Sequence, residues 1–420
     1  QSRVVKKGDY YRLYCSVWAV TKSIRTHHNY VIYSDDFGQS WHVLGGVGND
    51  ANPNQPGPAF GGNEPKCEEL PDGTVVLSSR KSGGRYFNLF TFDDDTYTTG
   101  SWGTCVSSND ITGGLSFGGN STNGEIYKVK AVRKSDGKIC DIMLQSVPTG
   151  SGRTDVAIYY KEMEYNEDGT NKYTPQTFAT GWTKGIHVST KGSCYSTMIL
   201  QADGRLAFFF EEEPSGYCMV YIPYTIEDVT GGAYSLYTVN TTIGEHGIGT
   251  FYASEAMQIP EGVKAYVVTD EPVMKEGTGY IKPEVLEGII PANTGAILMG
   301  DADTYNFIPS ISHGTPVNGN MLVGYEAADN KSDSKSAVAL PEGSTVYVLA
   351  VENEVAGFYK KDAGFDVYNN KAYLQIPGIQ SARSIVFDFG GETGIFETEN
   401  GKWETENGDV KTENCYDLSG

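Results

Sequence analysis

Residues 34–41 read Ser34-Asp35-Asp36-Phe37-Gly38-Gln39-Ser40-Trp41. They match the pattern S-x-D-x-G-x-[TS]-W, whose chemistry specifies one kind of hairpin turn. The serine and aspartate side chains can bond local backbone N–H groups, Gly38 allows a positive φ, and we expect Trp41 to plug back between strands. Such tips recur in β-propellers. The pattern shapes a turn and predicts no catalysis by itself.

A second pattern repeats along residues 1–237. Asp-Gly pairs at Asp72, Asp136 and Asp203 each separate two apolar runs, and Gly8-Asp9 is a weaker copy. The Asp positions 9, 72, 136 and 203 are therefore 63, 64 and 67 residues apart. Asp-Gly between apolar runs is a strong hairpin signal. One antiparallel sheet per repeat predicts about four propeller blades, although unrelated hairpins of a β-sandwich would give the same signal.

The character of the chain changes after residue 237. Residues 238–249 read as a linker. Residues 250–391 carry short apolar runs broken by proline and glycine, which predict a second β-rich, sandwich-like accessory domain. Residues 392–420 are polar and acidic, so we expect a loosely ordered tail.

Composition supports an all-β fold and excludes several functions. The 420 residues include 51 Gly and 28 Tyr, and no long helical periodicity stands out. A formal charge of −21 argues against a nucleic-acid partner, since phosphate binding needs a basic face. No run of about 18 apolar residues occurs, so we expect no membrane span. The 7 Cys are odd in number and lack metal-ligand spacing, which predicts free thiols, no metal and no cofactor.

The repeat also singles out chargeable side chains. Glu64 and Tyr195 each lie eight residues before the Asp of their own repeat, and Arg80 and Glu211 each lie eight residues after it. In a propeller the first strand of each blade lines the central channel. These four polar groups therefore recur at the channel-facing ends of otherwise apolar strands, which is typical of a binding or catalytic site. Strand ends that are simply exposed to solvent would give the same pattern.

Three segments carry a family resemblance. They are Asn63–Gly73 with Ser79-Arg80, Ser151-Gly152-Arg153-Thr154-Asp155, and Cys194–Met198 with Phe209-Phe210-Glu211. Together with the pattern at 34–41, known as the Asp box, they resemble bacterial exo-acting sialidases (neuraminidases) in the order of that family. The resemblance implies a six-bladed propeller, of which residues 1–237 would hold the later blades and lack the N-terminal ones.

The resemblance also implies roles. Tyr195 would be the nucleophile of a retaining exo-α-sialidase, Glu64 its general base, and Arg80 and Arg153 would bind the carboxylate of a sialylated glycan. Glu211 would orient the first arginine of a triad. The residue types suit the chemistry, because a carboxylate nucleophile would be repelled by the substrate carboxylate whereas a neutral phenol is not.

The chain departs from the family at two points. Residues 1–33 contain no Arg-Ile-Pro segment, which would supply the first triad arginine, and no Asp acid/base follows it. We therefore expect an incomplete portion with weak or no activity. A non-catalytic sialoglycan-binding propeller is the alternative, and transfer to another sugar is a third possibility that uses the same residues.

The end of the chain resembles exported proteins. Cys415–Gly420 is similar to the start of terminal modules on secreted Bacteroidota proteins, and Glu287–Gly295 is similar to accessory domains of the same proteins. This implies a truncated terminal module in residues 392–420 and a secreted, periplasmic or cell-surface location.

Overall fold

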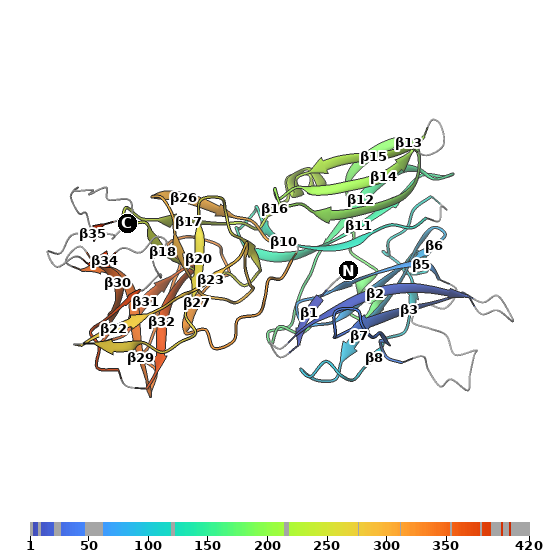
Figure 1. Ribbon diagram of the computed structural model, residues 1–420. Helices are drawn as coiled ribbons and strands as arrows, with labels where there is room; N and C mark the ends of the chain where they lie inside the picture. Colours follow the sequence, from blue (N-terminus) through green and yellow to red (C-terminus); the bar gives the residue numbers. More distant parts are fainter. Residues whose placement is uncertain are drawn as a thin grey trace. The chain divides into compact units, whose positions relative to one another are not determined.

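The protein is all-β, as predicted. The computed structural model describes residues 3–6, 10–20, 27–46, 62–118, 122–213, 218–275, 277–310, 312–352, 355–378, 380–387, 396–397 and 403–404. Its helices are a 3-10 turn, Ser108–Asp110, and the α-helices α1 (Pro175–Phe178) and α2 (Ile226–Thr230). Over these residues no helix has the length and hydropathy to cross a membrane. The chain divides into two compact units, residues 1–236 and 237–420 (Figure 1).

The first unit, coloured blue to green in Figure 1, is a succession of antiparallel strands. They are β1 (Arg3–Lys6), β2 (Tyr10–Val20), β3 (His27–Ser34), β4 (His42–Val43), β5 (Asn63–Glu69), β6 (Val75–Lys81), β7 (Gly84–Phe92), β8 (Gly100–Trp102), β9 (Val106–Ser107), β10 (Ile126–Arg133), β11 (Ile139–Pro148), β12 (Thr154–Glu162), β13 (Thr183–Leu200), β14 (Leu206–Glu212), β15 (Cys218–Tyr224) and β16 (Tyr234–Leu236).

These strands form four blade-like sheets within the described residues. The first is β1-β2-β3-β4 and the second is β5-β6-β7-β8. The third runs from β10 to β13, and the fourth from β13 to β15, because β13 serves both. Its residues 183–192 pair with β12, whereas residues 193–200 pair with β14. This double use explains the length of β13, which has 18 residues.

Consecutive sheets pack face to face. Val75 and Leu77 of β6 pack toward the first sheet, and Val76 between them packs toward the third. Because both faces of β6 are covered, its first three residues, Val75 to Leu77, are a continuous apolar run rather than an alternating one. A third cluster joins the third and fourth sheets, with Ile142, Leu144 and Ile158 on one side and Met198 and Phe208 on the other.

The Asp-Gly pairs of the repeat at Asp72, Asp136 and Asp203 form hairpin tips of one design. Each aspartate Oδ1 accepts from the backbone N–H two residues later, at 3.0 Å for Asp72, 3.2 Å for Asp136 and 3.0 Å for Asp203. The glycines that follow have φ between 74° and 85°. The three predicted hairpins are thus confirmed, and the copy at Gly8-Asp9 lies outside the described residues.

The turn at residues 34–41 has the expected polar contacts, but the side chain of Trp41 does not lie where the sequence predicts. Ser34 Oγ accepts from Gly38 N at 2.7 Å, and Asp36 Oδ1 accepts from Ser40 N at 2.8 Å. Gly38 has a φ of 92°. Trp41, however, is 41% exposed and does not plug between strands. Its Nε1 donates to the Gly38 carbonyl at 3.1 Å, so the indole is satisfied within its own turn.

The second unit, coloured yellow to red in Figure 1, holds the remaining strands. They are β17 (Val239–Ile243), β18 (Ile248–Phe251), β19 (Met257–Gln258), β20 (Lys264–Val267), β21 (Val273–Lys275), β22 (Thr278–Ile281), β23 (Glu284–Leu286), β24 (Ile289–Ile290), β25 (Ala296–Met299), β26 (Asp303–Phe307), β27 (Leu322–Tyr325), β28 (Lys335–Val338), β29 (Ser344–Glu352), β30 (Val355–Lys360), β31 (Phe365–Tyr368), β32 (Lys371–Pro377), β33 (Ser384–Phe387), β34 (Phe396–Glu397) and β35 (Trp403–Glu404).

Two sheets of this unit share one core, as in a β-sandwich. One sheet has the order β18-β25-β20-β23 and the other β21-β22-β33-β30-β29-β32-β27. Tyr266 and Ile297 of the first sheet pack with Tyr347, Phe358 and Leu374 of the second. The predicted sandwich-like fold of this region is confirmed.

The predicted linker at residues 238–249 is wrong. Residues 239–243 form β17 with strictly alternating burial, and β18 begins at Ile248. The β-branched side chains of β17 favour a strand, and two of the three glycines, Gly244 and Gly247, lie in the turn where Gly247 N donates to Gly244 O, while Gly249 lies in β18. Most of the predicted polar tail, 392–420, lies outside the described residues, except for the antiparallel pair β34 and β35.

The hairpin tip at Gly73 provides a test of this architecture. A Cβ on Gly73 would lie 2.2 Å from Tyr97 Cε1, whereas a Cβ on Gly169, which has a similar φ, meets nothing within 4 Å. Both alanine variants incur the left-handed backbone cost of about 1–2 kcal/mol. We expect Gly73→Ala to lose a further ~1–3 kcal/mol from overpacking, measured by urea denaturation. Equal losses for the two variants would contradict this packing.

Candidate functional site

Three side chains from separate strands of the first unit meet in one cluster. The Tyr195 hydroxyl on β13 donates to Glu64 Oε1 on β5 at 2.9 Å. Arg80 Nη1 on β6 donates to Glu64 Oε2 at 2.7 Å and lies 3.5 Å from the Tyr195 hydroxyl. Tyr195 is 38% exposed, so the cluster is open to a ligand. The structure thus brings together residues that are more than 130 positions apart in the sequence.

Irregular backbone aims these side chains. The β5–β6 register shifts between Asn63 and Pro65, and Glu64 between them has a φ of 39°. The β13–β14 register shifts between Ser193 and Ser196, on either side of Tyr195. A β-bulge is an extra residue in one strand; it interrupts the regular alternation of side chains and changes the direction in which the side chain at that position points. A non-glycine residue at positive φ costs about 1–3 kcal/mol and persists where its surroundings fix it.

Glu211 and Arg153 contact the chain around Tyr195. Glu211 bonds the Tyr195 backbone, and Arg153 bonds the preceding residue, Cys194. Glu211 Oε2 accepts from the Tyr195 backbone N–H at 3.1 Å, so it holds the strand that carries the phenol. Arg153, with a φ of 63°, precedes β12. Its Nη1 donates to Cys194 Sγ at 2.9 Å, and its carbonyl accepts from Ser193 N at 2.6 Å. The Arg153 guanidinium therefore contacts the residue before Tyr195 rather than the Glu64 carboxylate.

A second polar layer lies one step further along the same strands, and the sequence analysis missed it. Glu125 Oε2 accepts from Lys66 Nζ at 2.9 Å and from Thr197 Oγ1 at 2.7 Å. Lys66 follows Glu64 by two residues and Thr197 follows Tyr195 by two, so these side chains share the faces of the cluster. Lys66 and Thr197 both lie six residues before the Asp of their repeat, a signal that could have identified them. Glu125 has no such matched position.

The buried side chain of Arg85 is linked to Glu125 by a chain of hydrogen bonds. Arg85 is 1% exposed, and its Nε donates to Ser78 Oγ at 3.0 Å. Ser78 Oγ donates in turn to Gln145 Oε1 at 2.6 Å, and Gln145 Nε2 donates to the Glu125 carbonyl at 3.0 Å. Burial lowers the pKa of Arg85 to about 9, so the guanidinium stays charged at neutral pH. The buried positive charge of Arg85 therefore interacts with the carboxylates of Glu125 and Glu64.

The electrostatics keep the phenol neutral. The hydrogen bond to Glu64, with burial and the Glu64 charge, raises the pKa of Tyr195 above its ordinary value. Burial opposes the charged form of Arg80, but the hydrogen bond and charge of Glu64 outweigh it and raise the pKa of Arg80. A neutral hydroxyl that donates to a carboxylate within hydrogen-bond distance is the geometry of a nucleophile and its general base.

The cysteines and acidic residues give no sign of a metal centre. The six cysteines that the structure describes are free thiols. Among the described residues, no group of three or more His, Cys, Asp or Glu is placed to hold a metal ion.

Solved sialidases are similar to this chain. The intramolecular trans-sialidase from Ruminococcus gnavus has 17% identity and a TM-score of 0.35, covering 52% of this chain and 41% of its own. The NanB sialidase from Streptococcus pneumoniae has 19% identity and a TM-score of 0.34, with 51% and 31% covered. Trypanosoma rangeli sialidase has 12% identity and a TM-score of 0.35, with 89% and 64% covered.

The other comparisons are negative. No family model matches the chain, and no curated protein matches it by sequence. The chain spans between 31% and 64% of the three solved sialidases named above. At TM-scores this low, no role is transferred from those proteins to residues of this chain.

The Glu64–Tyr195 contact makes a measurable prediction. In Glu64→Gln the carboxylate charge that favours the neutral phenol is lost, so the pKa of Tyr195 should fall toward about 10. The titration of ¹³C-labelled tyrosine followed by NMR, with Tyr195→Phe to assign the signal, measures it. Glu167→Gln, in an exposed turn, is the matched control. An unchanged Tyr195 pKa in Glu64→Gln would mean that the two groups do not interact in solution.

Proposed function

We propose that the first unit carries the site of an exo-α-sialidase, which releases terminal sialic acids from glycoconjugates with retention of configuration. One observation carries the proposal: the Tyr195 hydroxyl donates to Glu64 at 2.9 Å while Arg80 bonds the second oxygen of the same carboxylate. A phenol, a base and a guanidinium are three of the groups that this reaction uses; the Asp acid/base and the first triad arginine of the family have no counterpart identified in the sequence, so the activity of this chain alone would be weak or absent. The resemblance of the segments around Glu64, Arg153 and Tyr195 to sialidases supports the same conclusion.

The substrate explains why a phenol serves as nucleophile. Sialic acid carries a carboxylate on its anomeric carbon, and a carboxylate nucleophile would approach it against like-charge repulsion. Neutral Tyr195 avoids that repulsion. As its oxygen bonds to the anomeric carbon, Glu64 accepts the phenol proton, the bond to the leaving sugar breaks, and solvent water protonates the leaving oxygen. Water then attacks the glycosyl-tyrosine and gives up its proton to solvent, Glu64 returns the proton to the phenolate, and two inversions give net retention.

The arginines would hold the substrate carboxylate. A guanidinium stays charged and presents a rigid fork of N–H donors that matches two carboxylate oxygens. Arg80 is already beside the reacting groups, and Arg153 is fixed next to Tyr195 through Cys194. Glu211 positions the nucleophile by holding its backbone N–H. We also propose that the protein acts outside the cytoplasm, where sialylated glycans are displayed, in keeping with its exported-type tail sequence.

Removal of the nucleophile tests the mechanism. We expect Tyr195→Phe to lower whatever turnover of an aryl α-sialoside the full chain shows by orders of magnitude, since the substitution removes the oxygen that would form the covalent intermediate. The matched control is Tyr221→Phe, another exposed tyrosine on the same sheet, which should leave turnover unchanged.

Two results would count against the proposed function. Near-normal turnover in Tyr195→Phe would remove Tyr195 from the mechanism. Binding of 3′-sialyllactose by calorimetry, with no release of free sialic acid from any sialoside, would instead assign a sialoglycan-binding propeller. Product analysis with an added acceptor sugar distinguishes hydrolysis from transfer.

The fork geometry of Arg153 gives a separate prediction. Arg153→Lys keeps the charge but loses bidentate binding, so kcat/KM for the sialoside should fall by about tenfold or more. Arg205→Lys, an exposed arginine paired with Asp203 at a hairpin tip, is the control and should not change it. Equal kinetics for the two variants would show that Arg153 does not bind the substrate.

A further inference from the structure

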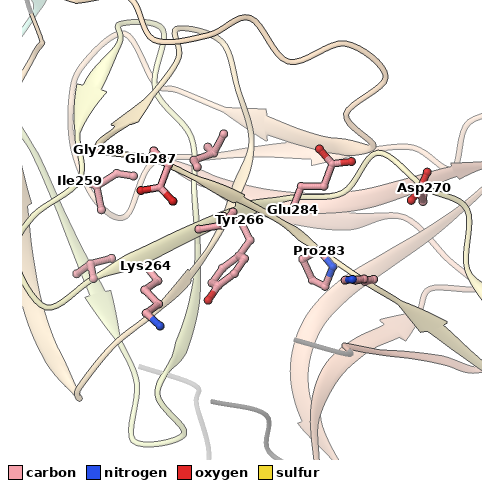
Figure 2. Close-up of a pocket in the computed structure, with 12 residues that line it drawn as sticks. Ile259, Lys264, Tyr266, Asp270, Pro283, Glu284, Glu287 and Gly288 are labelled. Atoms are coloured by element: carbon pink, nitrogen blue, oxygen red, sulfur yellow. The ribbon is translucent and has the colours of Figure 1, made fainter. Parts of the chain in front are cut away.

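The second unit contains a hollow beside the edge of its four-stranded sheet. It has a volume of about 890 Å³ and is lined by β20, β23 and the chain that flanks them. Figure 2 shows Lys264, Tyr266, Pro283, Glu284 and Glu287 around it. Small-molecule sites in proteins commonly measure about 300–1,000 Å³. The hollow is therefore large enough for a ligand of one or two sugar rings.

The floor of the hollow is rigid, and its most exposed apolar side chain is Val285. Tyr266 is 7% exposed and belongs to the sandwich core, so its ring is held in place. It lies directly opposite Val285 of β23, which is 52% exposed and also lines the hollow. In Figure 2 the polar ends of Lys264 and Tyr266 point the same way, as expected for residues two apart on a strand. A ligand can therefore pack on the carbons of Val285.

The rim carries charges of both signs that are not paired with each other. Lys264, Asp270, Lys282 and Glu287 are exposed, and none of the four forms an ion pair or a side-chain hydrogen bond with any residue that the structure describes. Glu284, the third acidic group, accepts from the Thr269 hydroxyl. Two ammonium donors and three carboxylate acceptors therefore surround this floor.

This combination fits a neutral saccharide. A sugar hydroxyl both donates and accepts, so it matches adjacent ammonium and carboxylate groups, while the C–H groups of the ring can pack on the exposed Val285 side chain. An anion would meet the three carboxylates, and a cation would meet the two lysines. We propose that this hollow in the second unit is a binding site for neutral glycans.

The proposed site stands apart from the chemistry of the first unit. Its residues all belong to the second unit, and its existence does not depend on the proposed sialidase activity. If the first unit is a sialidase, its product could be the ligand of this site, because a glycan that has lost its acidic terminal sugar is neutral. The second unit would then retain the protein on glycan chains that the first unit has already processed.

Titration of the full chain with lactose, N-acetyllactosamine and mannobiose, followed by calorimetry, tests the inference. We expect saturable binding of at least one of these sugars. The double variant Lys264→Gln/Glu287→Gln preserves side-chain size but removes both charges, and should weaken binding by about tenfold or more. The matched control is Glu342→Gln, an exposed carboxylate of the same unit outside the hollow, which should bind as the unaltered chain does.

Two further measurements test the proposed glycan site independently of the proposed sialidase site in the first unit. Tyr195→Phe should leave neutral-sugar binding unchanged, and the double variant should leave turnover of an aryl sialoside unchanged. A loss of sialidase activity with intact lactose binding would therefore bear on the first unit alone. The inference is overturned if none of the neutral sugars binds at millimolar concentration, if the double variant binds as tightly as the control, or if 3′-sialyllactose alone binds here.

Discussion

Face-to-face packing of successive antiparallel sheets is the constraint on which the first unit depends. It buries both faces of β6, so that Val75 and Val76 contact different neighbouring sheets. It also brings β5 against β10 and lets β13 pass from one sheet to the next. The strands that carry Glu64 and Tyr195 therefore belong to different sheets, and the packing between sheets sets the distance between them. Large apolar side chains far from the cluster thus contribute to its geometry.

Much of this arrangement could be predicted from local chemistry. The Asp-Gly pairs identify hairpin tips because an aspartate that bonds two residues ahead and a glycine at positive φ fit few other turns. Their spacing also matched Glu64 with Tyr195. Burial of Trp41 was mispredicted, because an indole can be satisfied within its own turn. Residues 238–249 were mistaken for a linker, because the glycine-rich turn obscured the alternation of β17.

The contacts of the site were less predictable than its residues. No spacing rule points to Glu125, which unites Lys66 and Thr197 from different sheets. The bulges at Glu64 and Tyr195 depend on pairing with β6 and β14, which a single strand does not encode. Glu211, which is predicted to orient the first arginine of a triad, also accepts a hydrogen bond from the Tyr195 backbone, a contact that no local pattern predicts. Side-chain partners across sheets are set by tertiary packing, and local patterns carry little information about them.

The Arg80–Glu64 ion pair has a consequence for selectivity. In the resting protein the same Nη1 that would grip an incoming acidic sugar is engaged by Glu64. If the proposed function holds, an acidic guest would have to displace Arg80 Nη1 from Glu64 Oε2 before it could use that donor. An uncharged guest would exert no comparable pull on the guanidinium. The ion pair would then act as a filter that admits anionic guests in preference to uncharged ones.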